Sequence, residues 1–144
     1  MNENREIKPL ALITGGHTGI GFGIAKELIQ ANFRIAIISE TAVKDKSVQF
    51  ALNKLGPLAH YYQHDLRDIS NLSNLLDQIE TNQGSIHSLI SNAGVSPLVR
   101  GDMLQINEVS YDFVMDINLK GTFFLAQETA RRILRQKIKF YRSM

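Results

Sequence analysis

Short runs of apolar residues recur along the chain, and each is separated from the next by a longer, more polar stretch. Each run has the length of a strand, and its residues are apolar throughout rather than alternately, which is typical of strands covered on both faces. We expect strands at residues 10–13, 34–38, 59–63 and 86–90.

The stretches between the runs carry apolar residues at helical spacing. The first stripe consists of Ile20, Ile24, Ala25, Leu28 and Ile29. Further helices are expected at about residues 41–55 and 70–80 and from about 109 to at least 136, the last of them interrupted or bent near Gly121. Strands that alternate with helices of this length predict an α/β fold with a parallel sheet. We find no linker or repeat, so residues 1–144 are expected to form one unit.

The loop after the first strand is rich in glycine and reads Thr14-Gly15-Gly16-His17-Thr18-Gly19-Ile20-Gly21. Glycines let backbone N–H groups approach an anion closely, and the helix that follows would point its positive N-terminus at the same place. This arrangement favours a pyrophosphate site. The alternative is that the glycines serve only the close packing of strand and helix.

Four segments together carry a resemblance. They are Thr14-Gly15-x-x-x-Gly19-Ile20-Gly21, Asp65-Leu66, Ser91-Asn92-Ala93-Gly94 and Asp116-Ile117-Asn118-Leu119-Lys120-Gly121-Thr122. In this order and spacing they resemble the motifs of the short-chain dehydrogenase/reductase family. Ser91 replaces the first Asn of the family's N-N-A-G motif. The resemblance covers about residues 10–134 and is closest in look to the 3-oxoacyl-[acyl-carrier-protein] reductase type.

The resemblance implies a Rossmann-type doubly wound parallel sheet and an NAD(P)(H)-dependent oxidoreductase that transfers hydride between a carbonyl and an alcohol. It also implies functional residues at the matching positions. The cofactor-binding candidates are Gly15, His17, Thr18, Gly19, Ile20, Gly21, Ser39, Glu40, Asp65, Leu66, Asn92, Ala93 and Gly94. The catalytic candidate is Asn118, as a member of a proton relay. Its alternative role is that of a helix-bending asparagine that satisfies a backbone carbonyl.

The choice between NAD and NADP stays open. Glu40 follows the second strand at the position where an acidic residue would accept hydrogen bonds from a ribose diol and repel a 2′-phosphate. The residue chemistry therefore favours NAD, whereas the reductase resemblance implies NADPH. A solvated acid at a helix start is the alternative interpretation of Glu40.

The chain departs from the family in its catalytic set. In the family a Ser follows the fifth strand and a Tyr-x-x-x-Lys pair lies on the next helix, but no tyrosine here has a lysine four residues later. The proton donor for the carbonyl is thus missing. We expect a chain truncated before the fifth strand and inactive alone. The alternative is a non-catalytic dinucleotide-binding or interaction module.

Composition and charge exclude several classes of protein. The 144 residues contain no cysteine, which excludes disulfides and zinc–thiolate sites, and the apolar runs are too short to span a membrane. The start of the chain does not look like a secretory signal, so we expect a cytoplasmic protein. His60 and His64 fall on a strand and its end, so no metal site is expected.

The last 14 residues, 131–144, contain six cations and no acid. We interpret them as the solvated basic end of a long helix, and binding of nucleic acid is not favoured. In the family the long helix packs against its twin. We therefore expect a homo-oligomer through residues 109–136 in the full-length form, acting on a small carbonyl or alcohol substrate.

Overall fold

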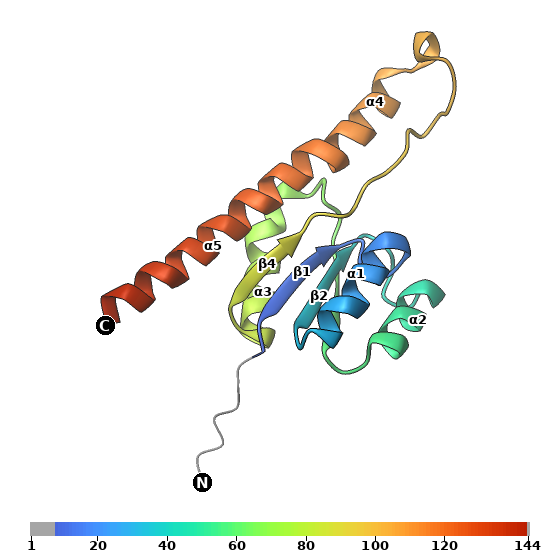
Figure 1. Ribbon diagram of the computed structural model, residues 1–144. Helices are drawn as coiled ribbons and strands as arrows, with labels where there is room; N and C mark the ends of the chain where they lie inside the picture. Colours follow the sequence, from blue (N-terminus) through green and yellow to red (C-terminus); the bar gives the residue numbers. More distant parts are fainter. Residues whose placement is uncertain (1–7, 144) are drawn as a thin grey trace.

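A four-stranded parallel sheet forms the centre of the molecule (Figure 1). The computed structural model describes residues 8–143. The strands are β1 (Leu10–Thr14), β2 (Arg34–Ser39), β3 (Ala59–Gln63) and β4 (Ile86–Ile90). Their order in the sheet is β3-β2-β1-β4, and every adjacent pair is parallel. The predicted α/β fold with a parallel sheet is confirmed.

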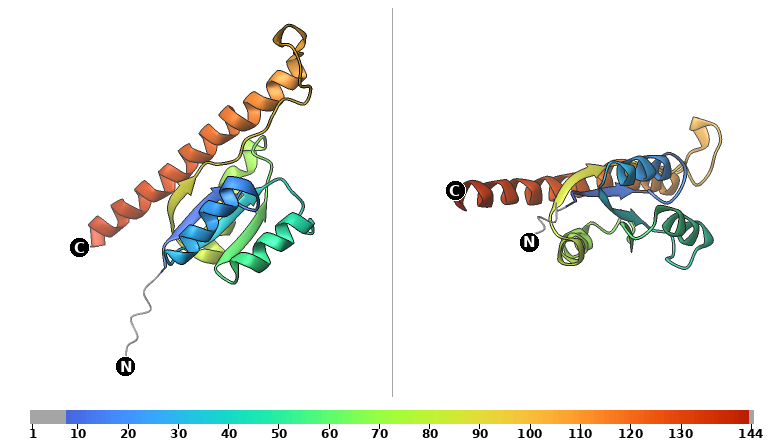
Figure 2. Two further views of the ribbon diagram at one scale, coloured as in Figure 1. Left: turned by 45° about the vertical axis from the view of Figure 1, so that its right-hand side comes forward. Right: turned by 60° about the horizontal axis from the view of Figure 1, so that its bottom comes forward.

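Helices connect the strands and continue beyond the last one. They are α1 (Gly19–Gln30), α2 (Lys46–Leu55), α3 (Leu72–Gln83), α4 (Glu108–Met115) and α5 (Thr122–Ser143). A π-helical turn at Asp116–Gly121 joins α4 to α5, and short 3₁₀ turns lie at Ile69–Asn71 and Met103–Gln105. The resulting long helix runs beside the sheet and past it at both ends (Figure 2).

The sheet has a separate apolar core on each face, because successive residues of a strand point to opposite sides. Ile13, Ile35 and Ile37 pack toward α1 and α2, where they meet Ala25 and Ala51. The neighbouring strand positions pack toward α3 and α5. These positions and their helical partners are Leu12, Ala36, Ile38, Leu76, Ile79 and Leu125. Both faces of β1 are therefore covered, as its continuous apolar run predicts.

The expectation that all four strands are covered on both faces is wrong for the outer two. In β3, Ala59 and Tyr62 are buried while His60 and Gln63 are exposed, and β4 is only partly buried after Ile86. The reason is their place in the sheet, because β3 and β4 are its two edges.

Two of the predicted helices need corrected limits. The helix expected from residue 41 begins at Lys46, because Asp45 accepts a hydrogen bond from the Ser47 amide and caps it. The helix expected at 70–80 is α3, displaced to residues 72–83. The long helix extends to Ser143, which agrees with the expected extent to at least residue 136, and the interruption expected near Gly121 is a π turn. Ile20 belongs to the predicted stripe but is 80% exposed.

The basic end of the long helix is not uniformly solvated, which corrects the prediction for Arg132. Its side chain is 7% exposed and donates to Asp77 and Glu80 of α3, at 2.7 Å each, and to Glu128 of α5 at 3.2 Å. The guanidinium therefore joins α3 to α5. One of the six cations of residues 131–144 is thus paired with acidic side chains inside the fold.

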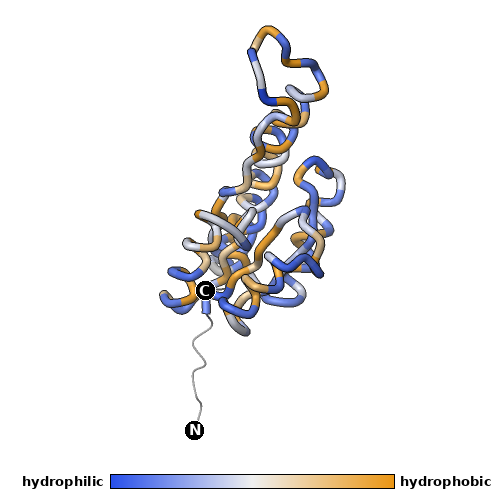
Figure 3. Tube along the Cα trace, turned by 90° about the vertical axis from the view of Figure 1, so that its right-hand side faces the viewer, coloured by the Kyte–Doolittle hydropathy of each residue, from blue (hydrophilic) through white to orange (hydrophobic). Residues whose placement is uncertain are grey.

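The connection between β4 and α4 projects away from the sheet (Figure 1) and forms the loop at the top of Figure 3. Its exposed apolar side chains are Leu98, Val99, Met103, Leu104 and Ile106. Within residues 8–143, no helix combines the length and the apolar character needed to cross a membrane.

Candidate functional site

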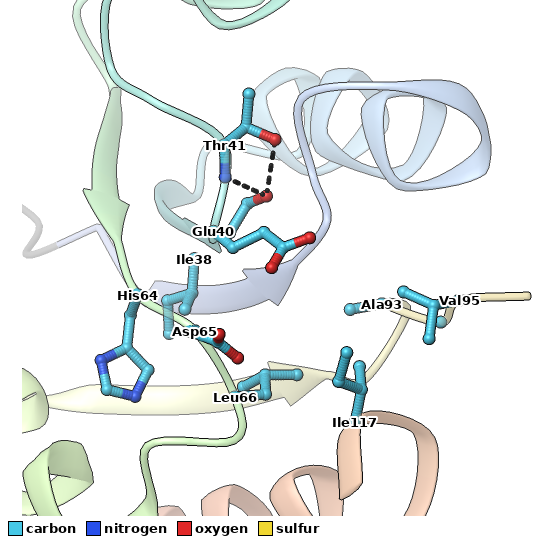
Figure 4. Close-up of a pocket in the computed structure, with 11 residues that line it drawn as sticks. Ile38, Glu40, Thr41, His64, Asp65, Leu66, Ala93, Val95 and Ile117 are labelled. Carbon is cyan, nitrogen blue, oxygen red and sulfur yellow. Dashed lines mark hydrogen bonds between the residues drawn. The ribbon is translucent and has the colours of Figure 1, made fainter. Parts of the chain in front are cut away.

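A pocket of about 140 Å³ lies where the strands end, at the carboxyl edge of the sheet (Figure 4). Its lining residues are Ile38, Ser39, Glu40, Thr41, His64, Asp65, Leu66, Ala93, Gly94, Val95 and Ile117. Ser39, Glu40, Asp65, Leu66, Ala93 and Gly94 are sequence-predicted candidates that the fold brings together here. They come from the ends of β2, β3 and β4, which meet because parallel strands finish on the same edge.

The glycine-rich loop adjoins this pocket at the end of β1. The Gly15 amide donates to the Ile38 carbonyl at 2.9 Å, which closes the turn toward β2. A Cβ atom at Gly21 would overlap the Gly15 carbonyl and the Asn92 side-chain amide. Glycine at position 21 therefore lets the start of α1 lie directly on the loop and on the end of β4.

The N-terminus of α1 carries no side-chain cap. Thr18 stands at the N-cap position in extended conformation, but its side chain accepts no hydrogen bond from the helix. By contrast, Asp45 caps α2 and Asn107 caps α4. The first-turn amides of α1 are thus available to an anion, and the helix dipole favours negative charge at this position. The exposed Ile20 lies in the same first turn.

Asn92 and Thr14 tie the end of β4 to the start of the glycine loop. Thr14 Oγ1 accepts from the Asn92 amide at 3.0 Å and from the Ala93 amide at 2.9 Å, while Asn92 Nδ2 donates to the Thr14 carbonyl at 3.0 Å. Thr14 was not among the predicted site residues. In the sequence, Thr14 directly follows a run of apolar residues. A hydroxyl buried at such a place needs hydrogen-bond partners, and this indicates a structural role for Thr14.

The acidic side of the pocket carries Glu40 and Asp65, whose carboxylates extend toward the space next to Ala93 and Ile117 (Figure 4). Two side-chain donors of Arg67 bind Asp65, with Nη2 to Oδ2 at 2.6 Å and Nε to Oδ2 at 3.0 Å, and the Arg67 amide donates to Oδ1 at 2.9 Å. This hydrogen bonding holds the pKa of Asp65 below its usual value, so its carboxylate is ionised at neutral pH.

His17 is not among the residues that line the pocket, and it packs against Tyr61 of β3. Its ring meets Tyr61 edge to face, with ring centres 5.9 Å apart. Burial lowers the pKa of His17, so the ring is neutral at neutral pH. Its Nδ1 atom is buried and has no hydrogen-bond partner within the described residues.

Asn118 lies in the π-helical turn and faces the segment after β4. Its Oδ1 accepts from the Val95 amide at 2.8 Å, and its Nδ2 donates to the Val95 carbonyl at 2.9 Å. The side chain therefore fixes the backbone next to Ala93 and Gly94. These contacts agree with the alternative role of Asn118, in which it satisfies a backbone carbonyl. Membership of a proton relay stays a prediction.

The predicted residues thus fall into two neighbouring groups. Those that do not line the 140 Å³ pocket are Gly15, His17, Thr18, Gly19, Ile20, Gly21, Asn92 and Asn118. The pocket also includes residues that the sequence reasoning missed, namely Ile38, Thr41, His64, Val95 and Ile117. Each of these is adjacent in the chain to a predicted residue or belongs to one of the four motifs. Across residues 8–143 no cluster of histidine and acidic side chains could hold a metal ion.

Comparison with known proteins places this geometry in a family. The sequence model of the short chain dehydrogenase family matches residues 9–138. The chain belongs to this family.

Two curated relatives illustrate the match. The 2-dehydro-3-deoxy-D-gluconate 5-dehydrogenase of Escherichia coli is 34% identical over 127 residues, which are 88% of this chain and 49% of the relative. The 3-oxoacyl-[acyl-carrier-protein] reductase FabG of Staphylococcus aureus is 29% identical and matches 88% of this chain and 51% of the relative. The chain spans about half the length of the curated relatives it matches.

Solved structures agree with this assignment. A 3-oxoacyl-[acyl-carrier protein] reductase from Brucella melitensis in complex with NAD has a TM-score of 0.79 and 34% identity, and covers 88% of this chain and 49% of its own. ElxO with NADP bound has a TM-score of 0.78 and 25% identity, and covers 89% of this chain and 51% of its own. The Rossmann-type fold is thereby confirmed.

Proposed function

We propose that the chain binds NAD(H) or NADP(H) at the carboxyl edge of its sheet. We propose further that it forms this part of an oxidoreductase that interconverts a carbonyl and an alcohol. The observation that carries the proposal is that six of the predicted cofactor residues line one pocket, beside the glycine-rich loop and the uncapped start of α1. The neighbours with bound NAD and NADP support the same ligand class.

The chemistry of the described residues fits a dinucleotide. The amides at the start of α1 can donate to a pyrophosphate. Gly21 has no side chain, so the start of α1 lies directly against the loop. The 140 Å³ pocket is smaller than the roughly 300–1,000 Å³ of sites that enclose a whole ligand, so it suits one end of an extended molecule. Such a cofactor, when bound, supplies or accepts the hydride.

Glu40 favours NAD over NADP. Its carboxylate lines the pocket and can accept hydrogen bonds from a ribose diol, and it would repel a 2′-phosphate. None of the residues lining the pocket is a lysine or an arginine that could pair with that phosphate. The resemblance to the 3-oxoacyl-[acyl-carrier-protein] reductase type favours NADPH instead, and direct binding measurements decide between them.

We propose a small carbonyl or alcohol as the substrate, of which a 3-oxoacyl group on a carrier protein is one example. These 144 residues contain no Tyr-x-x-x-Lys pair, so a side chain with the usual proton-donating role is missing from them. We therefore expect these residues alone to bind cofactor without turnover. The second candidate function is a non-catalytic dinucleotide-binding or interaction module. It predicts that a longer form of the protein also shows no turnover.

The test combines binding with turnover. The melting temperature is measured with and without NADH or NADPH, and consumption of each is followed with a 3-oxoacyl substrate. Binding to the folded chain raises the melting temperature, and the rise grows with the ratio of ligand concentration to Kd. The matched pair is Gly21→Ala, which blocks the loop, and Gly23→Ala, two residues further on in α1, where a Cβ meets nothing within 4 Å. If neither nucleotide shifts the melt, the proposal is wrong.

We further propose that the full-length protein is a homo-oligomer through the long helix. The large apolar side chains that it exposes include Leu119, Phe123, Leu134 and Ile138. Their spacing of four residues within each pair places each pair on one helix face. Sedimentation of the full-length protein should show a dimer or larger, and Phe123→Glu should shift it toward the monomer. A monomeric wild-type protein would contradict this proposal.

A further inference from the structure

The turn after β2 is held by three hydrogen bonds from β3. The carbonyl of Ser39 accepts from the His64 amide at 2.8 Å, and the carbonyl of Glu40 accepts from Gln63 Nε2 at 3.2 Å. The carbonyl of Thr41 accepts from the Tyr61 hydroxyl at 2.6 Å, the shortest of the three. Three consecutive carbonyls of residues 39–41 are therefore fixed by residues of one neighbouring strand or its end.

Tyr61 joins this turn to the glycine-rich loop. Its hydroxyl also lies 3.3 Å from the Ser39 carbonyl, and its ring meets the edge of the His17 ring with the two planes 83° apart. Burial raises the pKa of Tyr61, so the hydroxyl keeps its proton and remains a donor at neutral pH. One half-buried side chain thus contacts both segments that flank the N-terminus of α1 and the pocket.

The position of the Glu40 carboxylate depends on this turn. Glu40 lies between Ser39 and Thr41, whose carbonyls the Tyr61 hydroxyl approaches, and its own carboxylate extends into the pocket (Figure 4). A hydrogen bond from a ribose diol to the Glu40 carboxylate requires a donor–acceptor distance of about 2.5–3.0 Å. A small displacement of the turn would therefore break this hydrogen bond. Repulsion between a carboxylate and a phosphate also falls with distance.

We propose that Tyr61 is a positioning residue that makes the site discriminate between NADH and NADPH. Tyr61 itself contacts neither nucleotide. Instead its hydroxyl fixes the turn at residues 39–41, which places Glu40 against the ribose. The proposal rests on the proposed binding of a dinucleotide at this edge.

The test compares two tyrosines that are neighbours in the chain. Tyr61→Phe removes the hydroxyl that binds Thr41, whereas Tyr62→Phe removes a hydroxyl on the other face of the sheet, where it accepts from Gln83 Nε2 at 2.9 Å. Each variant of the full chain is titrated with NADH and with NADPH. In addition, amide hydrogen exchange of residues 39–45 is measured in the free protein.

For Tyr61→Phe we expect the Kd for NADH to rise about fivefold, the size typical of one lost hydrogen bond. The Kd for NADPH should stay the same or fall, and amide exchange at residues 39–45 should accelerate. Tyr62→Phe should leave the ratio of the two Kd values unchanged. A second variant, Gln63→Met, removes the exposed donor to the Glu40 carbonyl and should lower the same discrimination to a smaller extent.

Three outcomes overturn the proposal. If Tyr61→Phe weakens both nucleotides equally, Tyr61 contributes only to stability. If amide exchange at residues 39–45 is unchanged, the hydroxyl does not hold the turn. If amide exchange accelerates in Tyr61→Phe but the wild-type chain binds neither nucleotide, the Tyr61 hydroxyl does hold the turn. In that case the proposed function is wrong, and the proposed discrimination is wrong with it. Failure of the two proposals is therefore distinguishable.

Discussion

The side-chain amide of Asn118 pairs with both backbone groups of Val95, accepting from its N–H at 2.8 Å and donating to its C=O at 2.9 Å. This pairing joins the π-helical turn to the segment after β4, so the wall of the pocket depends on a residue in the middle of the long helix. Such single π turns inside α-helices are frequent at functional sites.

Replacing Asn118 by alanine should loosen this wall. We expect Asn118→Ala to lower the free energy of unfolding by about 1 kcal/mol, the usual size for lost hydrogen bonds to groups that water can reach. Amide exchange at Val95 should accelerate at the same time. The control is Asn53→Ala on the exposed side of α2. An unchanged Val95 exchange rate would show that the pairing does not persist in solution.

Arg132 should contribute far more to stability than its neighbour Arg131. Arg132→Ala removes the buried guanidinium that binds Asp77, Glu80 and Glu128. We expect a loss of about 2 kcal/mol, below the roughly 3–5 kcal/mol of a fully buried pair because the Asp77 side chain is 65% exposed. Arg131→Ala, at a side chain that is 56% exposed, should change stability by about 0.5 kcal/mol or less. Urea unfolding measures both, and equal losses would contradict the assignment.

Gly121 should tolerate no side chain. A Cβ atom there would overlap the carbonyl oxygen of Leu66, which lines the pocket. Gly121→Ala should therefore cost about 1–3 kcal/mol by overpacking. Gly23→Ala, in open space on α1, should instead stabilise the chain by up to about 1 kcal/mol. A neutral Gly121→Ala would show that the long helix does not approach the β3–α3 connection as closely as described.

Stability should fall when the pH drops below about 6.5, because of His17. Burial lowers the pKa of His17 in the folded chain, so the unfolded chain takes up the proton at higher pH. The contribution of the neutral ring is present above the unfolded pKa of about 6.5 and is lost as the pH falls toward the folded pKa. His17→Gln should reduce this dependence, measured by urea unfolding between pH 7.5 and 5. The same change at the exposed His60 is the control, and an equal effect of the two substitutions would refute the role of His17.

Cofactor preference should change with the charge at position 40. Glu40→Arg replaces a carboxylate that would repel a 2′-phosphate with a cation that would bind it. We expect the variant to bind NADPH more tightly and NADH more weakly, so that the ratio of their Kd values shifts by about tenfold or more, equivalent to about 1.4 kcal/mol. Titration of both nucleotides checks this. An unchanged ratio would mean that Glu40 does not face the ribose.

Local patterns in the sequence were sufficient to predict the sheet. β1 and β2 are distinct apolar runs, and parallel strands bring their ends to one edge, so residues as distant as Glu40 and Ala93 could be assigned to one site. Thr14 and Val95 were missed because their roles come from hydrogen bonds to partners 78 and 23 residues away, which no spacing rule shows. Arg132 was misjudged for the same reason, since two of its acidic partners, Asp77 and Glu80, lie on another helix.

The central claim is that a nicotinamide dinucleotide binds at the carboxyl edge of the sheet, and its location can be measured directly. Backbone amide resonances of the chain are followed by NMR while NADH is added. Binding at the described site predicts saturable shifts at residues 15–21, 39–41, 65–66 and 92–95, with small changes along residues 131–139. Shifts confined to the basic end of the long helix, or none at millimolar NADH, would contradict the claim.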